Sequence, residues 1–184
     1  MSPFDAKTRS QAMRPSRRAF ATVLAFMLHP ASLAWPDPAA QEIKLEPAIE
    51  VKAIEVKMIS RERWDRSTPE KSYFGVHSAN KNGDVEWIVA GFAPAERDSI
   101  RKYVGDKQLL DANTALFRSI TRETIIKKVT YGDYVILVLE ARRSDGRRFL
   151  RNIPFKSVGR DWLVTNDLSA DPVFLGLKSG YVDQ

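Results

Sequence analysis

The chain has 184 residues and contains no cysteine, which excludes disulfide bonds, thiolate metal sites and cysteine nucleophiles. Its formal net charge is +6, but residues 1–34 hold five basic residues against one acidic residue, a net of +4. The rest of the chain is therefore only weakly basic. It lacks the domain-wide basic footprint of a nucleic-acid-binding protein, and we expect no nucleic-acid partner.

Residues 16–34 have the pattern of a cleavable signal peptide. Arg17 and Arg18 precede an apolar run at 19–28, and His29-Pro30 interrupts that run before a group of small residues. The run is shorter than the roughly 20 apolar residues that a transmembrane helix needs. We expect cleavage after Ala34, with Ala40 as the second choice, and no transmembrane anchor in the mature protein.

The stretch Ser16-Arg17-Arg18-Ala19-Phe20 resembles the twin-arginine export motif of bacteria. Ala21 and Thr22 depart from that family, which usually has leucine and lysine at these places. The resemblance implies a periplasmic or secreted protein, with the general secretion route as the alternative. Translation could start at Met1 or at Met13, since both starts keep the motif.

The mature chain begins with a flexible segment and continues as one domain. Residues 35–48 contain three prolines and few candidates for a core, whereas 49–184 are long enough to form a single domain. Apolar residues alternate over 49–58 with one slip of register. This pattern predicts a strand with a bulge.

A loop and a hairpin are predicted next. Residues 60–71 are charged and contain Pro69, which indicates a loop. Asn82-Gly83 then separates two runs that favour β-structure, at 73–78 and 85–90. Because both turn residues tolerate a positive φ, the pattern predicts a β-hairpin.

Two helices follow. Pro94 is placed to open a helix that Gly105 ends. The side chain of Asp106 can cap a second helix, whose apolar residues recur at helical spacing from Leu109 to Ile120.

The remaining chain predicts an antiparallel β-meander. Its strands are expected at residues 124–130, 133–141, 147–156 and 160–166. Short links that contain glycine force neighbouring strands to run antiparallel. Residues 134–139 are apolar on both faces, which predicts a central strand covered on both sides. A last helical turn is expected from Asp171-Pro172 to Gly180.

This order of elements predicts an α+β fold in which helices pack on one face of a curved antiparallel sheet. Residues 94–175 resemble, in element order, the cystatin-like rolls of the nuclear-transport-factor superfamily. The resemblance implies a pocket or a dimer interface on the open face of the sheet. Members of that superfamily range from isomerases and dehydratases to binding modules, so the resemblance leaves the function open.

The candidates for catalysis are few. His77 is the only histidine after the signal peptide, and as a general base it would need an orienting partner such as Asp84 or Glu86. Tyr134 and Glu140 lie on one face of the central strand and could act as oxyanion donor and base. One histidine without cysteines argues against a zinc site, and no motif for a cofactor is present.

The densest feature is a group of arginines around one predicted hairpin tip, namely Arg142, Arg143, Arg147, Arg148 and Arg151. Guanidinium groups bind phosphates and carboxylates through two parallel hydrogen bonds, so this tip could hold an anionic ligand or an acidic partner. The alternative is a hairpin whose charges prevent edge-to-edge aggregation. Trp64, in a charged loop, is a candidate ligand contact or a cap on the core.

Together these patterns favour an exported protein that binds rather than catalyses, with an unknown envelope protein or an anionic ligand as its partner. A small pocket enzyme that uses His77 or Glu140 as its base is the first alternative. A structural subunit that forms homodimers is the second. No cofactor or metal is expected in any of these interpretations.

Overall fold

The computed structural model describes residues 49–177 and 179–181. The predicted signal peptide and the segment at 35–48 lie outside the described residues. The strands are β1 (Ile49–Glu55), β2 (Ile120–Tyr131), β3 (Tyr134–Arg143), β4 (Arg148–Val158), β5 (Asp161–Val164) and β6 (Gly180–Tyr181). The helices are α1 (Pro69–Asn82), α2 (Val85–Ala90), α3 (Arg97–Gly105), α4 (Lys107–Ser119) and α5 (Pro172–Gly176). Short 3₁₀ turns lie at Arg61–Arg63 and Pro94–Glu96.

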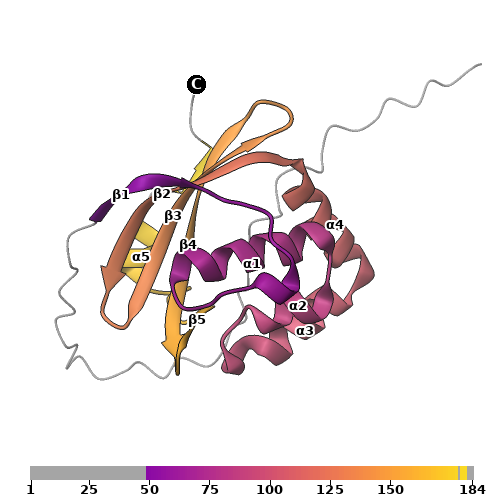
Figure 1. Ribbon diagram of the computed structural model, residues 1–184, viewed down its shortest axis with the longest axis horizontal. Coiled ribbons are helices and arrows are strands. Elements are labelled where there is room, and N and C mark those ends of the chain that lie inside the picture. Colours follow the sequence, from indigo (N-terminus) through magenta and orange to yellow (C-terminus); the bar gives the residue numbers. More distant parts are fainter. Residues whose placement is uncertain (1–48, 178, 182–184) are drawn as a thin grey trace, which may run out of the picture. The chain divides into compact units, whose positions relative to one another are not determined.

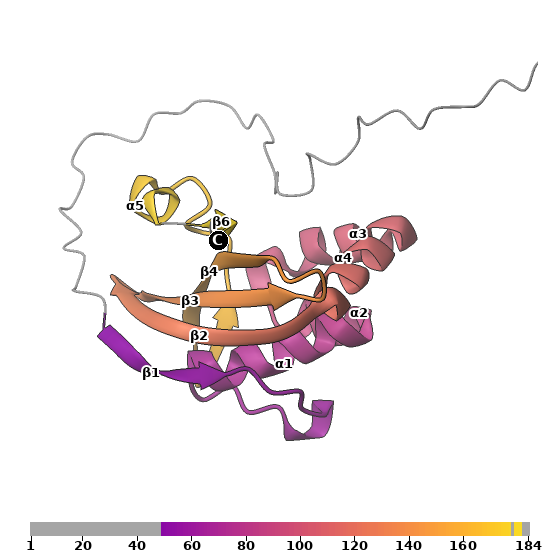
Figure 2. The same ribbon diagram turned by 90° about the horizontal axis from the view of Figure 1, so that it is seen from above.

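The strands form one antiparallel sheet in the order β1-β2-β3-β4-β5, and β6 pairs with the other half of β4. Helix α1 lies across one face of the curved sheet with α2 to α4 grouped around it, and α5 lies against the other face (Figures 1 and 2). We call these the helical face and the α5 face. The predicted α+β class, with helices on one face of an antiparallel meander, is confirmed.

The prediction of a central strand covered on both faces is also confirmed. Val135, Leu137 and Leu139 of β3 belong to the core cluster beneath α1. The intervening Ile136 and Val138 pack in a second cluster that includes residues of α5. Because both faces of β3 are covered, six of its ten residues are buried, as its apolar sequence requires.

The predicted hairpin at 73–90 is wrong, because both of its arms are helices. Pro69, expected in a loop, stands in the first turn of α1, after Thr68, whose hydroxyl accepts a hydrogen bond from the Lys71 backbone N–H. Gly83 ends the helix at φ 72°, and Asp84 then caps α2 by accepting from Trp87 N at 2.9 Å. A glycine at positive φ suits the end of a helix as well as a hairpin turn, so the Asn-Gly signal fits both structures.

The other predicted elements are present. The helix expected from Pro94 is α3 after a 3₁₀ turn, and Asp106 caps α4 by accepting from Gln108 N and Leu109 N. All strands of the meander form with the expected neighbours. Only the last turn differs, since α5 ends at Gly176 and Gly180 belongs to β6.

Strand β2 contains a register shift between Ile125 and Lys127. Before the shift, Glu123 contacts Tyr73 of α1, and after it Lys128 forms an ion pair with Glu70 of the same helix at 2.9 Å. Both charged residues therefore reach the helical face, although strict alternation would put them on opposite faces. Among the described residues, no helix is both long and apolar enough to cross a membrane.

Candidate functional site

Three arginines stand side by side on the α5 face of the sheet. Arg142 of β3 is opposite Arg122 of β2 on one side and opposite Arg148 of β4 on the other. We call these three residues the arginine row. They border a hollow of about 290 Å³, which is lined by Arg122, Thr124, Ile126, Glu140, Arg142 and Arg148.

The arginine row is only partly neutralised. Arg148 lies 3.7 Å from Glu140, and Arg122 lies 3.9 Å from Glu55, both as exposed pairs of the kind that contributes little. No carboxylate in the described part of the chain pairs with Arg142. Like charges directly opposite each other on neighbouring strands repel, so the row keeps an uncompensated positive charge beside the hollow.

The predicted arginine group is therefore divided. Arg142 and Arg148 belong to the row, whereas Arg143 and Arg147 lie at the hairpin tip. The Nε of Arg147 donates to Asp145 Oδ2 at 2.8 Å, and this hydrogen bond lowers the pKa of Asp145. Arg143 Nε donates to Ser119 Oγ at 3.2 Å. Both guanidinium groups at the tip thus already have partners.

Arg151 points to the opposite, helical face and joins a buried polar cluster. We give this name to Tyr73, His77, Glu123 and Arg151. The guanidinium of Arg151 donates to Glu123 Oε1 at 3.1 Å and lies 4.7 Å from the ring centre of Phe117 on α4. Arg151 is thus held away from any ligand at the arginine row.

Glu123 is the centre of the buried polar cluster, with a side chain only 1% exposed. Tyr73 OH donates to its Oε2 at 2.9 Å, and His77 Nδ1 lies 2.7 Å from the same oxygen without the alignment of a hydrogen bond. Burial alone would raise the pKa of Glu123. The charge of Arg151, helped by His77 and Tyr73, outweighs that effect and lowers the pKa below its ordinary value of 4.5.

This geometry corrects the expected environment of His77. Neither Asp84 nor Glu86 orients it, because Asp84 caps α2 and Glu86 lies 3.4 Å from Arg101. His77 lies instead on α1, one turn after Tyr73, and is only 3% exposed. The ring lies in the layer between α1 and the sheet, and its role as a general base stays a prediction.

Tyr134 and Glu140 are not brought together. Tyr134 OH donates to Asp167 Oδ2 at 3.0 Å, and burial together with this carboxylate raises the pKa of Tyr134. Glu140 pairs with Arg148 at the hollow of the arginine row, whereas Tyr134 lines a different hollow. An acid–base pair of the predicted kind is therefore absent at these two residues.

Trp64 lies against α1. Its Nε1 donates to the Ser72 carbonyl at 3.0 Å, and its indole lies so close to Gly75 that a Cβ there would overlap it. Arg66 stacks over the ring at 5.0 Å. The tryptophan thus caps the core, and its role as a ligand contact stays a prediction.

Sequence reasoning missed Arg122 and Glu123. Glu123 stands two residues before Ile125 and so shares the inward face of β2, which marks it as a buried acid. The signal for Arg122 was weaker, since its place beside Arg142 depends on the register between β2 and β3. Among the described residues, no group of three or more His, Asp or Glu side chains could hold a metal ion.

Comparisons with known proteins give little more. No protein-family model matches the chain, and neither does any curated protein. Among solved structures, the chain is similar to the solution structure of a SEC-C motif containing protein from Rhodopseudomonas palustris, at 18% identity and a TM-score of 0.40. The match covers 64% of this chain and 80% of that chain. A likeness at this level assigns neither a family nor a function.

Proposed function

We propose that this protein is an exported, non-catalytic binding module that holds an anionic group between the guanidinium groups of the arginine row. The observation that carries the proposal is the placing of Arg122, Arg142 and Arg148 directly opposite one another across three strands. Their mutual repulsion disfavours the empty row, and an anion between them would relieve it.

The hollow has groups suited to such a ligand. Guanidinium groups offer paired N–H donors that match the geometry of phosphate and carboxylate oxygens. The Thr124 hydroxyl adds a further donor on the same hollow. Glu140 pairs with Arg148 and Glu55 with Arg122, so the free charge of the row is concentrated at Arg142.

The test is binding of inorganic pyrophosphate to the full chain, measured by calorimetry at low salt. Replacing Arg122, Arg142 and Arg148 together by serine should abolish the binding. The matched control is Arg147→Ser at the same hairpin, because that side chain is already paired with Asp145. Binding that survives the triple change, or that R147S reduces equally, would contradict the proposal.

Export is supported by the signal-like residues 16–34 and is tested separately. Changing Arg17 and Arg18 to lysine should leave the precursor in the cytoplasm, because lysine keeps the charge but not the twin-arginine motif. Fractionation followed by immunoblotting of the precursor and mature forms provides the measurement. Normal export of the lysine variant would indicate the general secretion route instead.

A further inference from the structure

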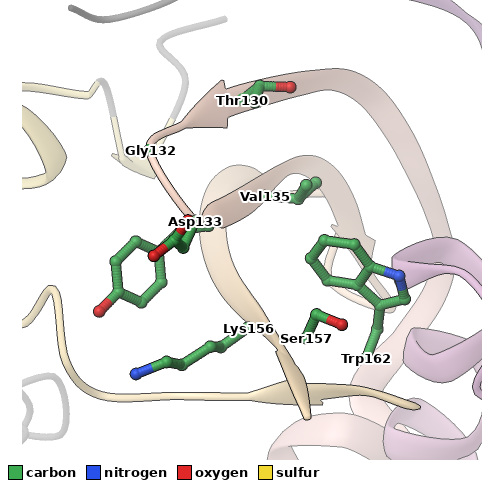
Figure 3. Close-up of a pocket in the computed structure, with 8 residues that line it drawn as sticks. Thr130, Gly132, Asp133, Val135, Lys156, Ser157 and Trp162 are labelled. Carbon is green, nitrogen blue, oxygen red and sulfur yellow. The ribbon is translucent and has the colours of Figure 1, made fainter. Parts of the chain in front are cut away.

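A second hollow, of about 390 Å³, lies where β2 turns into β3 and β4 turns into β5 (Figure 3). Its lining is Thr130, Gly132, Asp133, Tyr134, Val135, Lys156, Ser157 and Trp162. We call it the strand-end hollow. Four neighbouring strands contribute to it, since Thr130 is opposite Val135 and Ser157 is opposite Trp162. It shares no lining residue with the hollow of the arginine row.

Trp162 forms a fixed wall of the strand-end hollow. Its backbone N–H donates to the Arg66 carbonyl at 2.9 Å, and its own carbonyl accepts from Ser72 Oγ. Figure 3 shows the indole directed towards Val135, with Ser157 beside it. The ring itself packs against the core cluster that contains Val135, and it offers a flat apolar surface to a ligand.

Hydrogen-bonding groups without partners among the described residues also line the hollow. The hydroxyls of Thr130 and Ser157 and the carboxylate of Asp133 make no hydrogen bond or ion pair with any residue that the structure describes. Two hydroxyls can both donate and accept, whereas the carboxylate only accepts. A ligand that satisfies all three must therefore carry donors for Asp133 and groups that donate to or accept from the two hydroxyls, as a polyhydroxylated molecule does.

Charge excludes an anionic ligand here. Lys156 is the only cation in the lining, and its Nζ already lies 3.0 Å from Asp167 Oδ2. Asp133 has no cationic partner in the described part of the chain and would repel a phosphate or a carboxylate. Lys156 at the rim in turn disfavours a cationic ligand, which leaves a neutral one.

We propose that the strand-end hollow binds a neutral sugar ring. The C–H face of the sugar would lie on the Trp162 indole, and its hydroxyls would donate to Asp133 and exchange hydrogen bonds with Thr130 and Ser157. The volume of about 390 Å³ is at the lower end for small-ligand pockets, which fits one ring rather than a long chain.

The test is a titration of the ¹⁵N-labelled full chain with glucose, galactose and N-acetylglucosamine, followed by amide NMR. At least one sugar should shift the amides of residues 130–135 and 155–163 with millimolar affinity, as expected for a small open site. Asp133→Asn and Ser157→Ala should each weaken that binding several-fold, since both changes remove a ligand contact without touching the core. Ser144→Ala, at the β3–β4 turn far along the sheet, is the control and should bind as the unchanged chain does.

Choline chloride and inorganic phosphate are the comparison probes. Binding of choline, with no binding of any of the three sugars, would indicate a cation site and overturn the proposal. Shifts of the same amides with phosphate would indicate an anion site and would also overturn it. Absence of any shift with the three sugars, or shifts that D133N and S157A leave unaltered, would also overturn it. The test is independent of the arginine row, because the two hollows have no residue in common.

Discussion

Glu123 carries its carboxylate into the layer between α1 and the sheet, where water does not reach it. A carboxylate buried in this way is unfavourable unless charged or hydrogen-bonding partners surround it. Arg151 provides the charge, Tyr73 provides a hydrogen bond, and His77 lies in contact. The position of α1 on the sheet therefore depends on residues from three elements, namely α1, β2 and β4.

Removing Arg151 should be far more damaging than removing another arginine of the same hairpin. Arg151→Met leaves Glu123 buried without its cation, which should lower the free energy of unfolding by about 3–5 kcal/mol. Arg147→Ser, at the exposed tip, should change it by less than about 0.5 kcal/mol. Urea denaturation followed by circular dichroism measures both changes.

The double variant E123Q/R151M should recover part of that loss, because it removes both buried charges. Equal stability of R151M and R147S would show that the buried polar cluster does not fix α1.

The alternation of side chains along β4 explains why the arginines of this hairpin lie on different faces of the sheet. Arg148 and Arg151 are three residues apart on one strand and so face opposite sides of the sheet.

At the scale of elements, the first strand and the second half of the chain were predictable, and the segment at 69–90 was not. Gly132, Gly146 and Gly159 all have positive φ in the turns of the meander, where the sequence placed tight links between alternating strands. Gly83 also has a positive φ, but its turn joins two helices. Only the caps at Thr68 and Asp84 distinguish the two cases, and threonine and aspartate are also common in loops and turns.

Gly83→Ala should destabilise the protein by about 1–2 kcal/mol, because φ is 72° there and an L-residue is strained in that region. An added Cβ would also lie 3.0 Å from Thr114 Oγ1. The matched control is Gly105→Ala, since Gly105 does not have a positive φ and a Cβ there meets nothing within 4 Å.

The expected result is a lower thermal midpoint for G83A and an unchanged or slightly higher one for G105A. Differential scanning calorimetry on the full chain measures both. Two equal midpoints would mean that the helix end at Gly83 is not held in the left-handed conformation.

At the scale of the whole molecule, two buried groups limit the pH range of the fold. The pKa of Glu123 is lowered in the folded protein, so its contribution to stability is present above 4.5 and is lost as the pH falls through the folded value. Burial, together with the charge of Glu123, raises the pKa of Tyr73 well above 10. Its contribution is therefore present below 10 and is lost as the pH rises beyond that value.

We therefore expect the urea midpoint to be nearly constant between pH 5 and 9, apart from the effects of exposed groups, and to fall on both sides. The variant Tyr73→Phe should weaken the fall on the alkaline side, because it has no phenol to ionise. Glu123→Gln should weaken the fall on the acid side. A fall of the same steepness in either variant would assign the pH dependence to other groups.

The register shift in β2 has a consequence for which changes of length the chain tolerates. The shift divides the strand into two segments in which the alternation of side chains between the two faces is offset by one residue. Glu123 and Lys128 therefore both reach α1. Substituting Ile126 would alter only the packing of one side chain. Deleting it would leave Glu123 and Lys128 four positions apart, and a strand of uniform alternation would then carry both on the helical face. We therefore expect the loss of one residue at the shift to remove the bulge and to keep both attachments of α1.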